Sequence, residues 1–162
     1  MKRLCTICLM LLCVTFTFAQ LNIVKNSAKK GYETIATSDA KQKSLSISLD
    51  SGTFYLIDIK PSYGQSGYDL YIPLGKTKES ALQSLNDLLT LSTTLEGDAS
   101  VKIGGYVTHS YTHQLLEIEI HVSAGKILGQ PYLTFQHDYN SDAQYCWDKQ
   151  DITKMIKALN KY

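Results

Sequence analysis

Two histidines, His109 and His113, lie four residues apart, and they are the residues of this chain whose spacing best suits metal-assisted hydrolysis. On a helix this spacing would place both rings on one side. The flanking segments have the period of strands, so the pair falls in a connection. A loop could still direct both imidazoles to one metal ion, with Glu117 or His121 nearby. The interpretation that we favour is an exposed hairpin tip with two ordinary histidines.

Asp138, Asn140 and Asp142 have the spacing of the first half of a calcium-binding loop. The pattern then fails, because Ala143 replaces the glycine at the sixth position and Lys149 replaces the glutamate at the twelfth. We therefore predict that these side chains hydrogen-bond to their own backbone in a turn. The chain also lacks the nucleophile-elbow, zinc-protease, phosphate-loop and dinucleotide motifs. The sequence predicts no cofactor and favours a protein that is not an enzyme.

Cys146 is the only one of the four cysteines that lies outside the first nineteen residues. A single thiol forms no intramolecular disulfide and supplies no four-cysteine zinc site, so the fold must depend on its hydrophobic core. We predict that Cys146 is a small buried residue between Tyr145 and Trp147. The alternatives are a nucleophilic thiol or an intermolecular disulfide.

Tyrosine is the residue type that most suggests binding, with eleven tyrosines against four phenylalanines and one tryptophan. Several lie in two polar segments, residues 62–69 and 138–145. The mixture of tyrosine with small polar residues offers rigid amphipathic contact area and adaptable hydrogen bonds, as in antibody paratopes. The predicted partner-binding residues are Tyr63, Gln65, Tyr68, Asp69, Tyr139, Asn140, Asp142 and Tyr145. The alternative is that both segments are plain turns whose tyrosine rings pack over the sheet edges.

The first nineteen residues have the layout of a cleaved secretory signal peptide. A positive start at Lys2 and Arg3 precedes an apolar run over residues 4–18, and Ala19 ends a plausible cleavage site. A transmembrane anchor needs about 20 predominantly apolar residues, which is more than this run supplies. We therefore expect an exported protein, periplasmic or extracellular, with no transmembrane segment after cleavage.

Cleavage after Ala19 would leave 143 of the 162 residues, a length that suits one domain. The net charge of this part is about −1 with neutral histidines, because Lys2 and Arg3 are lost and all 15 acidic residues remain. Without a basic excess we exclude nucleic acid as a partner. Arg3 is the only arginine, so no guanidinium remains for bidentate recognition of carboxylate or phosphate.

Hydrophobic periodicity predicts the elements that must position these residues. A flexible segment is expected at residues 20–31. Alternation with a period of two predicts strands at residues 43–49, 68–74 and 116–122. Further strands are expected at residues 32–37, 54–59, 101–108, 132–137 and 145–147. Leucines at helical spacing predict a helix from a Thr77 cap to about Ser92, and a second apolar stripe predicts a closing helix near the end of the chain. Gly104 and Gly105 indicate a bulge or a close approach within a strand.

The predicted fold class is α+β, with an antiparallel β-sheet and two amphipathic helices packed on one of its faces. The two halves, residues 32–92 and 101–162, resemble one another. Two stretches align, at offsets of 71 and 77 residues, namely 45–49 with 116–120 and 55–56 with 132–133. This pattern indicates an internal duplication of a strand-rich unit that ends in a helix, and the alternative is chance similarity between alternating strands. Since neither half would bury its apolar face easily alone, we expect residues 32–162 to form a single α+β domain.

These observations favour a secreted, non-catalytic binding module that contacts a protein or glycan partner through its tyrosine-bearing segments. One alternative is a metal-assisted hydrolase with its site at His109 and His113. Another is an envelope inhibitor or immunity-type protein that forms a tight complex with a secreted enzyme.

Overall fold

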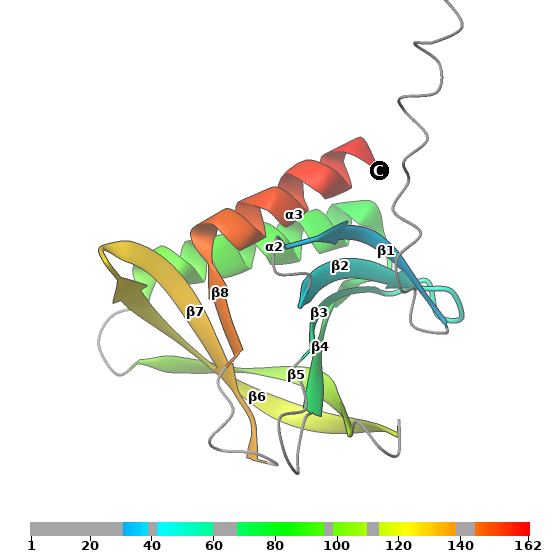
Figure 1. Cartoon of the computed structure of the whole chain (residues 1–162), viewed down its shortest axis with the longest axis horizontal. Coiled ribbons are helices and arrows are strands. Elements are labelled where there is room, and N and C mark those ends of the chain that lie inside the picture. Colours follow the sequence, from blue (N-terminus) through cyan, green and yellow to red (C-terminus); the bar gives the residue numbers. More distant parts are fainter. Residues whose placement is uncertain (1–30, 39–41, 60–67, 96–98, 110–113, 139–144) are drawn as a thin grey trace, which may run out of the picture.

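A computed structural model describes residues 31–38, 42–59, 68–95, 99–109, 114–138 and 145–162. The predicted signal peptide lies outside these ranges, as does the predicted flexible segment except for Gly31. The described residues form one eight-stranded sheet and two helices, α2 and α3, which follow the fourth and the eighth strand (Figure 1).

Each half of the described chain contains four strands and then a helix. The first half consists of β1 (Tyr32–Thr37), β2 (Lys43–Ser48), β3 (Phe54–Ile59), β4 (Tyr68–Gly75) and α2 (Lys78–Thr94). The second half consists of β5 (Ser100–His109), β6 (Leu115–Ile127), β7 (Gln130–Gln136), β8 (Tyr145–Asp148) and α3 (Lys149–Lys161). In the sequence alignment of the two halves, β2 matches β6 and β3 matches β7. A common origin of the halves stays a prediction.

Neighbouring strands all pair antiparallel, and their order in the sheet follows their order in the chain. This confirms the predicted α+β fold with its antiparallel sheet and two helices. We call the side of the sheet that packs against the helices the helix face, and the opposite side the far face.

Both helices begin at a residue whose side chain caps the free amides of the first turn. Thr77 Oγ1 accepts a hydrogen bond from the backbone N–H of Ser80 at 3.1 Å, and the Asp148 carboxylate accepts one from the backbone N–H of Asp151 at 2.7 Å. Apolar residues at helical spacing then form one buried stripe on each helix. These residues are Ala81, Leu85 and Leu88 in α2, and Ile152, Met155 and Leu159 in α3.

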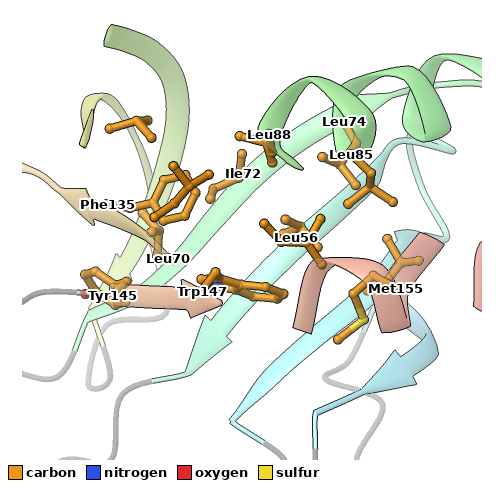
Figure 2. Packing of buried hydrophobic residues seen from close by; sticks show 14 of the residues in the cluster. Leu56, Leu70, Ile72, Leu74, Leu85, Leu88, Phe135, Tyr145, Trp147 and Met155 are labelled. Carbon is orange, nitrogen blue, oxygen red and sulfur yellow. The ribbon is translucent and has the colours of Figure 1, made fainter. Parts of the chain in front are cut away.

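The sheet is strongly curled around the helices. The Tyr145 hydroxyl on β8 donates a hydrogen bond of 2.8 Å to the backbone carbonyl of Tyr68 on β4. These strands are four positions apart, which corresponds to about 19 Å in a flat sheet. Figure 1 shows the same curvature, with β1 and β2 on one side of the helices and β7 and β8 on the other. The curled sheet therefore encloses one core, to which both halves contribute (Figure 2).

The far face of β2 differs from the expectation for a half-buried strand. Ser44, Ser46 and Ser48 are all buried there, with exposed fractions of 8%, 1% and 8%. Larger residues stand beside them, since Ser48 pairs with Tyr32 of β1 and Ser46 pairs with Tyr55 of β3. Small serines on β2 thus leave room for the tyrosine rings of the adjacent strands, and β2 is covered on both faces.

Two residues expected inside are more exposed than predicted. Leu49 was expected to end the strand 43–49, in which it alternates with Leu45 and Ile47, but β2 ends at Ser48, and Leu49 begins the turn with 65% of its surface exposed. Cys146 was expected to be buried, but it is only half-buried and its thiol is free. The alternation of β8 directs Tyr145 and Trp147 to the core, so Cys146 faces the opposite side.

The turn between β6 and β7 contains a leucine in an unfavourable conformation. Ile127 pairs with Gln130, so Leu128 and Gly129 form a two-residue turn in which both have positive φ, at 49° and 78°. This is the geometry of a type I′ turn, which favours Asn-Gly. Positive φ is costly for a leucine, and the Leu128 side chain is 99% exposed and gains little from packing.

We expect Leu128→Asn to raise the free energy of unfolding by about 1 kcal/mol, because asparagine tolerates positive φ far better than leucine does. Urea denaturation at fixed protein concentration measures the change. Leu49→Asn is the matched control, since it also removes an exposed turn leucine, but one without positive φ. An equal gain from both variants would show that hydrophobic exposure, and not backbone strain, is relieved.

Candidate binding site at the loop end of the sheet

One end of the sheet gathers the connections that join β1 to β2, β3 to β4, β5 to β6 and β7 to β8. This follows from the strictly sequential antiparallel order, in which alternate connections leave from the same end. The two tyrosine-bearing segments, 62–69 and 138–145, are two of these connections. We call this the loop end, and its described residues include the last residues of β3, β5 and β7 and the first residues of β4 and β8.

A buried polar cluster lies at the loop end, where β4 meets β7 and β8. We call Asp58, Tyr68, Asp69, His137 and Tyr145 the loop-end cluster. Its rings are in contact, because the His137 ring centroid lies 5.8 Å from that of Tyr68 and 5.6 Å from that of Tyr145. His137 and Tyr145 are almost completely buried, at 2% and 0% exposed. The cluster therefore joins residues from both halves of the chain, and its hydrogen bond from Tyr145 to Tyr68 spans 77 positions.

Burial sets the protonation states of this cluster. It raises the pKa of the Tyr145 hydroxyl, with smaller contributions from the negative charges of Asp58 and Asp69. It lowers the pKa of His137, although the charge of the neighbouring Asp138 opposes this shift. Near neutral pH, Tyr145 therefore keeps its proton and His137 is uncharged.

These states determine the direction of the hydrogen bonds. The single proton of the Tyr145 hydroxyl is donated to the carbonyl of Tyr68. His137 Nε2 lies 3.3 Å from the same hydroxyl oxygen, so it must be the donor of that hydrogen bond. The neutral ring of His137 consequently carries its proton on Nε2. The chain of donors runs from β7 through β8 to β4 and fastens the two halves together at the loop end.

Two carboxylates lie on the first-half side of this chain. Asp58 is 4% exposed near the end of β3, and it pairs across the ladder with Leu70 of β4. Asp69 is half-buried, and its Oδ2 lies 3.5 Å from Thr108 Oγ1 of β5. The charges of Asp58 and Asp69 give the loop end a negative potential on this side. A negative potential suits hydrogen-bond donors and cations of a partner better than it suits an anion.

The predicted binding residues fall into two groups. Tyr68, Asp69 and Tyr145 are described, and the structure brings them together in the loop-end cluster. Tyr145 is completely buried and uses its hydroxyl internally, whereas Tyr68 and Asp69 are half-buried. The other predicted residues, which lie outside the described ranges, are Tyr63, Gln65, Tyr139, Asn140 and Asp142.

The weaker metal hypothesis also involves the loop end. His109 is the last residue of β5, and its backbone pairs with Tyr68, while His113 lies outside the described part of the chain. Within the described ranges, no group of three or more histidine, cysteine, aspartate or glutamate side chains is placed to hold a metal ion.

The sequence interpretation missed His137 and Asp58, although each has a signal. Asp58 interrupts a strand that is otherwise apolar and aromatic, Phe54–Ile59, which indicates a buried carboxylate with a specific role. His137 lies two residues after Phe135, so it continues the row of inward-facing residues Leu133 and Phe135. A histidine in register with core residues is a candidate for a buried hydrogen-bonding role.

A second tyrosine cluster lies on the far face. Tyr32, Tyr55, Tyr71 and Tyr106 come from β1, β3, β4 and β5, and the ring centroids of the contacting pairs lie 5.6 to 6.3 Å apart. Most of these pairs have the edge-to-face geometry that aromatic rings favour. Burial is the main reason that the pKa of Tyr32 rises to about 12. This far-face cluster packs β1 against β3–β5 and was not predicted.

Beyond the far-face cluster, the far face carries charged groups. The Lys102 ammonium lies 2.7 Å from Glu119, and His121 lies 3.8 Å from the same carboxylate. The hydrogen bond from Lys102 lowers the pKa of Glu119 and raises that of Lys102. Both partners are well exposed, so the pair contributes little to stability. Glu117, Glu119 and His121 are alternate residues of β6, so they share this face.

We expect acid to destabilise this protein partly through His137. Its folded pKa lies below the unfolded value of about 6.5, so the unfolded state binds the proton more readily. The stabilising contribution of the neutral ring is fully present above pH of about 6.5 and is lost as the pH falls towards the folded pKa. Urea titrations at about pH 7.5 and about pH 5 should show a larger loss of stability for the native protein than for His137→Gln.

His121→Gln is the matched control for this comparison, because the His121 ring lies half-exposed on the far face. It should lose as much stability between the two pH values as the native protein does. If His137→Gln shows the same loss as the native protein, His137 does not contribute to the acid sensitivity.

Comparison of the chain with family models, curated proteins and solved structures finds no match. None of the helices in the described ranges is long and apolar enough to cross a membrane.

Proposed function

We propose that this chain is an exported, non-catalytic binding protein and that its partner contacts the loop end of the sheet. The observation that carries the proposal is the hydrogen bond from the Tyr145 hydroxyl to the carbonyl of Tyr68. It fastens the end of one tyrosine-bearing segment to the end of the other. The residues at which the two segments join the sheet are thereby held together, although they are 77 positions apart in the chain.

The chemistry of the anchored residues favours a partner that offers hydrogen-bond donors and an apolar face. Tyr68 and Asp69 are half-buried at the start of β4 and direct their side chains to opposite faces of the sheet, and an aromatic ring and a carboxylate at one end of the sheet suit both a protein surface and a glycan. Tyr68 and Tyr145 are the residues at which the two segments join the sheet. Holding them in place reduces the conformational entropy that is lost when a partner binds. Export is proposed from the layout of residues 1–19, and it is consistent with a fold that needs no disulfide.

The double variant Tyr63→Ala/Tyr139→Ala tests the proposal. It removes one ring from each tyrosine-bearing segment and leaves the residues of the loop-end cluster unchanged. We expect an unchanged melting temperature and circular dichroism spectrum, together with at least a tenfold weaker capture of the partner from an envelope extract. Tyr162→Ala is the matched control, because Tyr162 is an exposed tyrosine that lies outside both tyrosine-bearing segments.

Capture by the double variant at the level of the native protein would contradict binding at the loop end. N-terminal sequencing of the secreted material tests export separately, and the proposal expects it to begin at Gln20.

A further inference from the structure

The middle of the sheet contains a gap between β4 and β5. The two strands pair only from Tyr68–Tyr71 to Tyr106–His109, next to the loop end. Within the described part of the chain, neither Ile72–Gly75 nor Ser100–Gly105 has a ladder partner on the side that faces the gap. The strands therefore separate towards the opposite end of the sheet and leave a cleft.

The cleft has a volume of about 290 Å³ and a mostly apolar lining. Ile72 and Leu74 of β4 form one wall, and Ile103 of β5 forms the other, while Leu88 and Leu91 of α2 contribute from the helix side. Among the described residues that line it, Asp87 is the only charged one. The cleft thus has an apolar interior and lies between the edges of two strands, β4 and β5.

The two edges differ in what they offer. On β4, Pro73 has no backbone N–H, and the carbonyl of Leu74 already accepts a hydrogen bond of 2.8 Å from Ser84 Oγ. On β5, Ser100–Gly105 contains no proline and pairs with β6 on its other side. Alternate residues of a strand direct their N–H and C=O groups to opposite sides. Part of this stretch therefore presents its N–H and C=O groups to the gap.

Two glycines make the β5 edge accessible. A Cβ atom at Gly105 would lie 2.9 Å from the backbone oxygen of Tyr71, so Gly105 permits the close approach that the sequence predicts. Gly104 is exposed, and nothing lies within 4 Å of a Cβ placed there. The mouth of the cleft is open at Gly104, where a side chain would otherwise stand.

We propose that this cleft binds an extended segment of a partner polypeptide, which adds to the edge of β5 as a strand. Main-chain groups of the segment would pair with Ser100–Gly104, and its alternate apolar side chains would enter the cleft against Leu88 and Leu91. The carboxylate of Asp87 favours a basic residue in the segment near the α2 side of the cleft.

The main-chain groups of β5 that have no ladder partner among the described residues decide between this occupant and others. A helix uses its own main-chain groups internally, and an apolar small molecule has none, so either would leave the edge of β5 unpaired. An extended peptide satisfies the edge and the apolar walls together. This surface lies away from the loop-end cluster, so the inference does not depend on the proposed function.

A panel of synthetic heptapeptides tests the inference directly. Each is acetylated and amidated, with lysine at both ends and valine or phenylalanine alternating with threonine between them. We expect at least one peptide to shift the amide resonances of Val101–Gly104 and the methyl resonances of Leu88 and Leu91 in the isotopically labelled native protein. The same peptide with alternate backbone amides methylated should bind at least tenfold more weakly, because it has lost the donors of the added strand.

Gly104→Trp supplies the matched protein variant, because the indole enters open space at the mouth of the cleft. It should keep the native melting temperature and bind the peptide at least tenfold more weakly. Lys126→Trp, which adds an indole to an exposed position on β6 outside the cleft lining, should bind as the native protein does.

Three results would overturn the inference. The first is that no peptide of the panel shifts the β5 amides at millimolar concentration. The second is equal binding of the methylated and unmethylated peptides, which would indicate an apolar pocket that does not recognise a strand. The third is undiminished binding by a folded Gly104→Trp variant.

Discussion

Trp147→Ala should reduce the free energy of unfolding by about 3–5 kcal/mol, which is the range for removing a large aromatic side chain from a core. Trp147 is completely buried on β8, in the same core cluster as Leu56 of β3 and Met155 of α3 (Figure 2). The Lys43 ammonium of β2 lies 5.6 Å from its ring centroid. The Trp147 side chain thus packs where the curled sheet brings elements of the first half and the second half together. Such a loss is a large part of the 5–15 kcal/mol that stabilises a typical domain.

Circular dichroism in urea is the suitable measurement for this variant, because Trp147 is the only tryptophan and its fluorescence is lost with it. Cys146→Ala is the matched control, since it truncates the neighbouring side chain on the other face of the same strand, and it should cost less than about 1 kcal/mol. A loss of similar size in both variants would mean that β8 is weakened as a strand and that the core position of Trp147 is not the cause.

Trp147→Phe guards against a variant that does not fold. Within the described residues the buried indole Nε1 has no hydrogen-bond partner, so phenylalanine removes volume and also an unsatisfied polar group. The cost should therefore be well below that of Trp147→Ala, at about 1–2 kcal/mol.

Tyr145→Phe should cost about 1–3 kcal/mol, because it removes one hydroxyl from the middle of a buried chain of hydrogen bonds. The Tyr68 carbonyl loses the donor that reaches it from β8, and His137 Nε2 loses the oxygen to which it donates. The ring itself stays in place, so the change measures the polar contacts and not the packing. Urea denaturation gives the stability, and the slope of the transition should not change.

Tyr162→Phe is the matched control for Tyr145→Phe, because Tyr162 is 54% exposed and its hydroxyl is accessible to water. It should change stability by less than about 0.5 kcal/mol. If Tyr145→Phe is equally mild, the hydrogen bonds at the loop end do not fasten the two halves. In that case the support for the proposed binding surface would also be lost.

The boundaries of the elements follow largely from local patterns. β1 and β3 have the bounds predicted from the sequence, and the cap at Thr77 starts α2 where the change of period places it. Such features depend on residues a few positions apart, so they can be recognised in one sequence. The internal similarity also aligns β2 with β6 and β3 with β7, which hold the same places in the element order of the two halves.

The curvature of the sheet could not be predicted in this way, because it depends on contacts between distant residues. Tyr68 and Tyr145 both stand out in the sequence as the ends of tyrosine-bearing segments, but nothing local shows that one donates to the backbone of the other. The buried serines of β2 were misjudged for the same reason, since tyrosines of other strands cover them. Pro73 is the one local sign of the gap between β4 and β5.

The last helix has a consequence for the time at which this chain can finish folding. Helix α3 contacts α2, β7 and β8 and also β1, the first strand of the sheet, and its Asp151 forms an ion pair with Lys43 of β2. β1 therefore lacks the cover of α3 until the chain has been synthesised through Lys161. A ribosome-bound chain that stops before Lys149 exposes the surface of β1 that α3 covers, and a chaperone that binds this surface would delay folding until α3 is made.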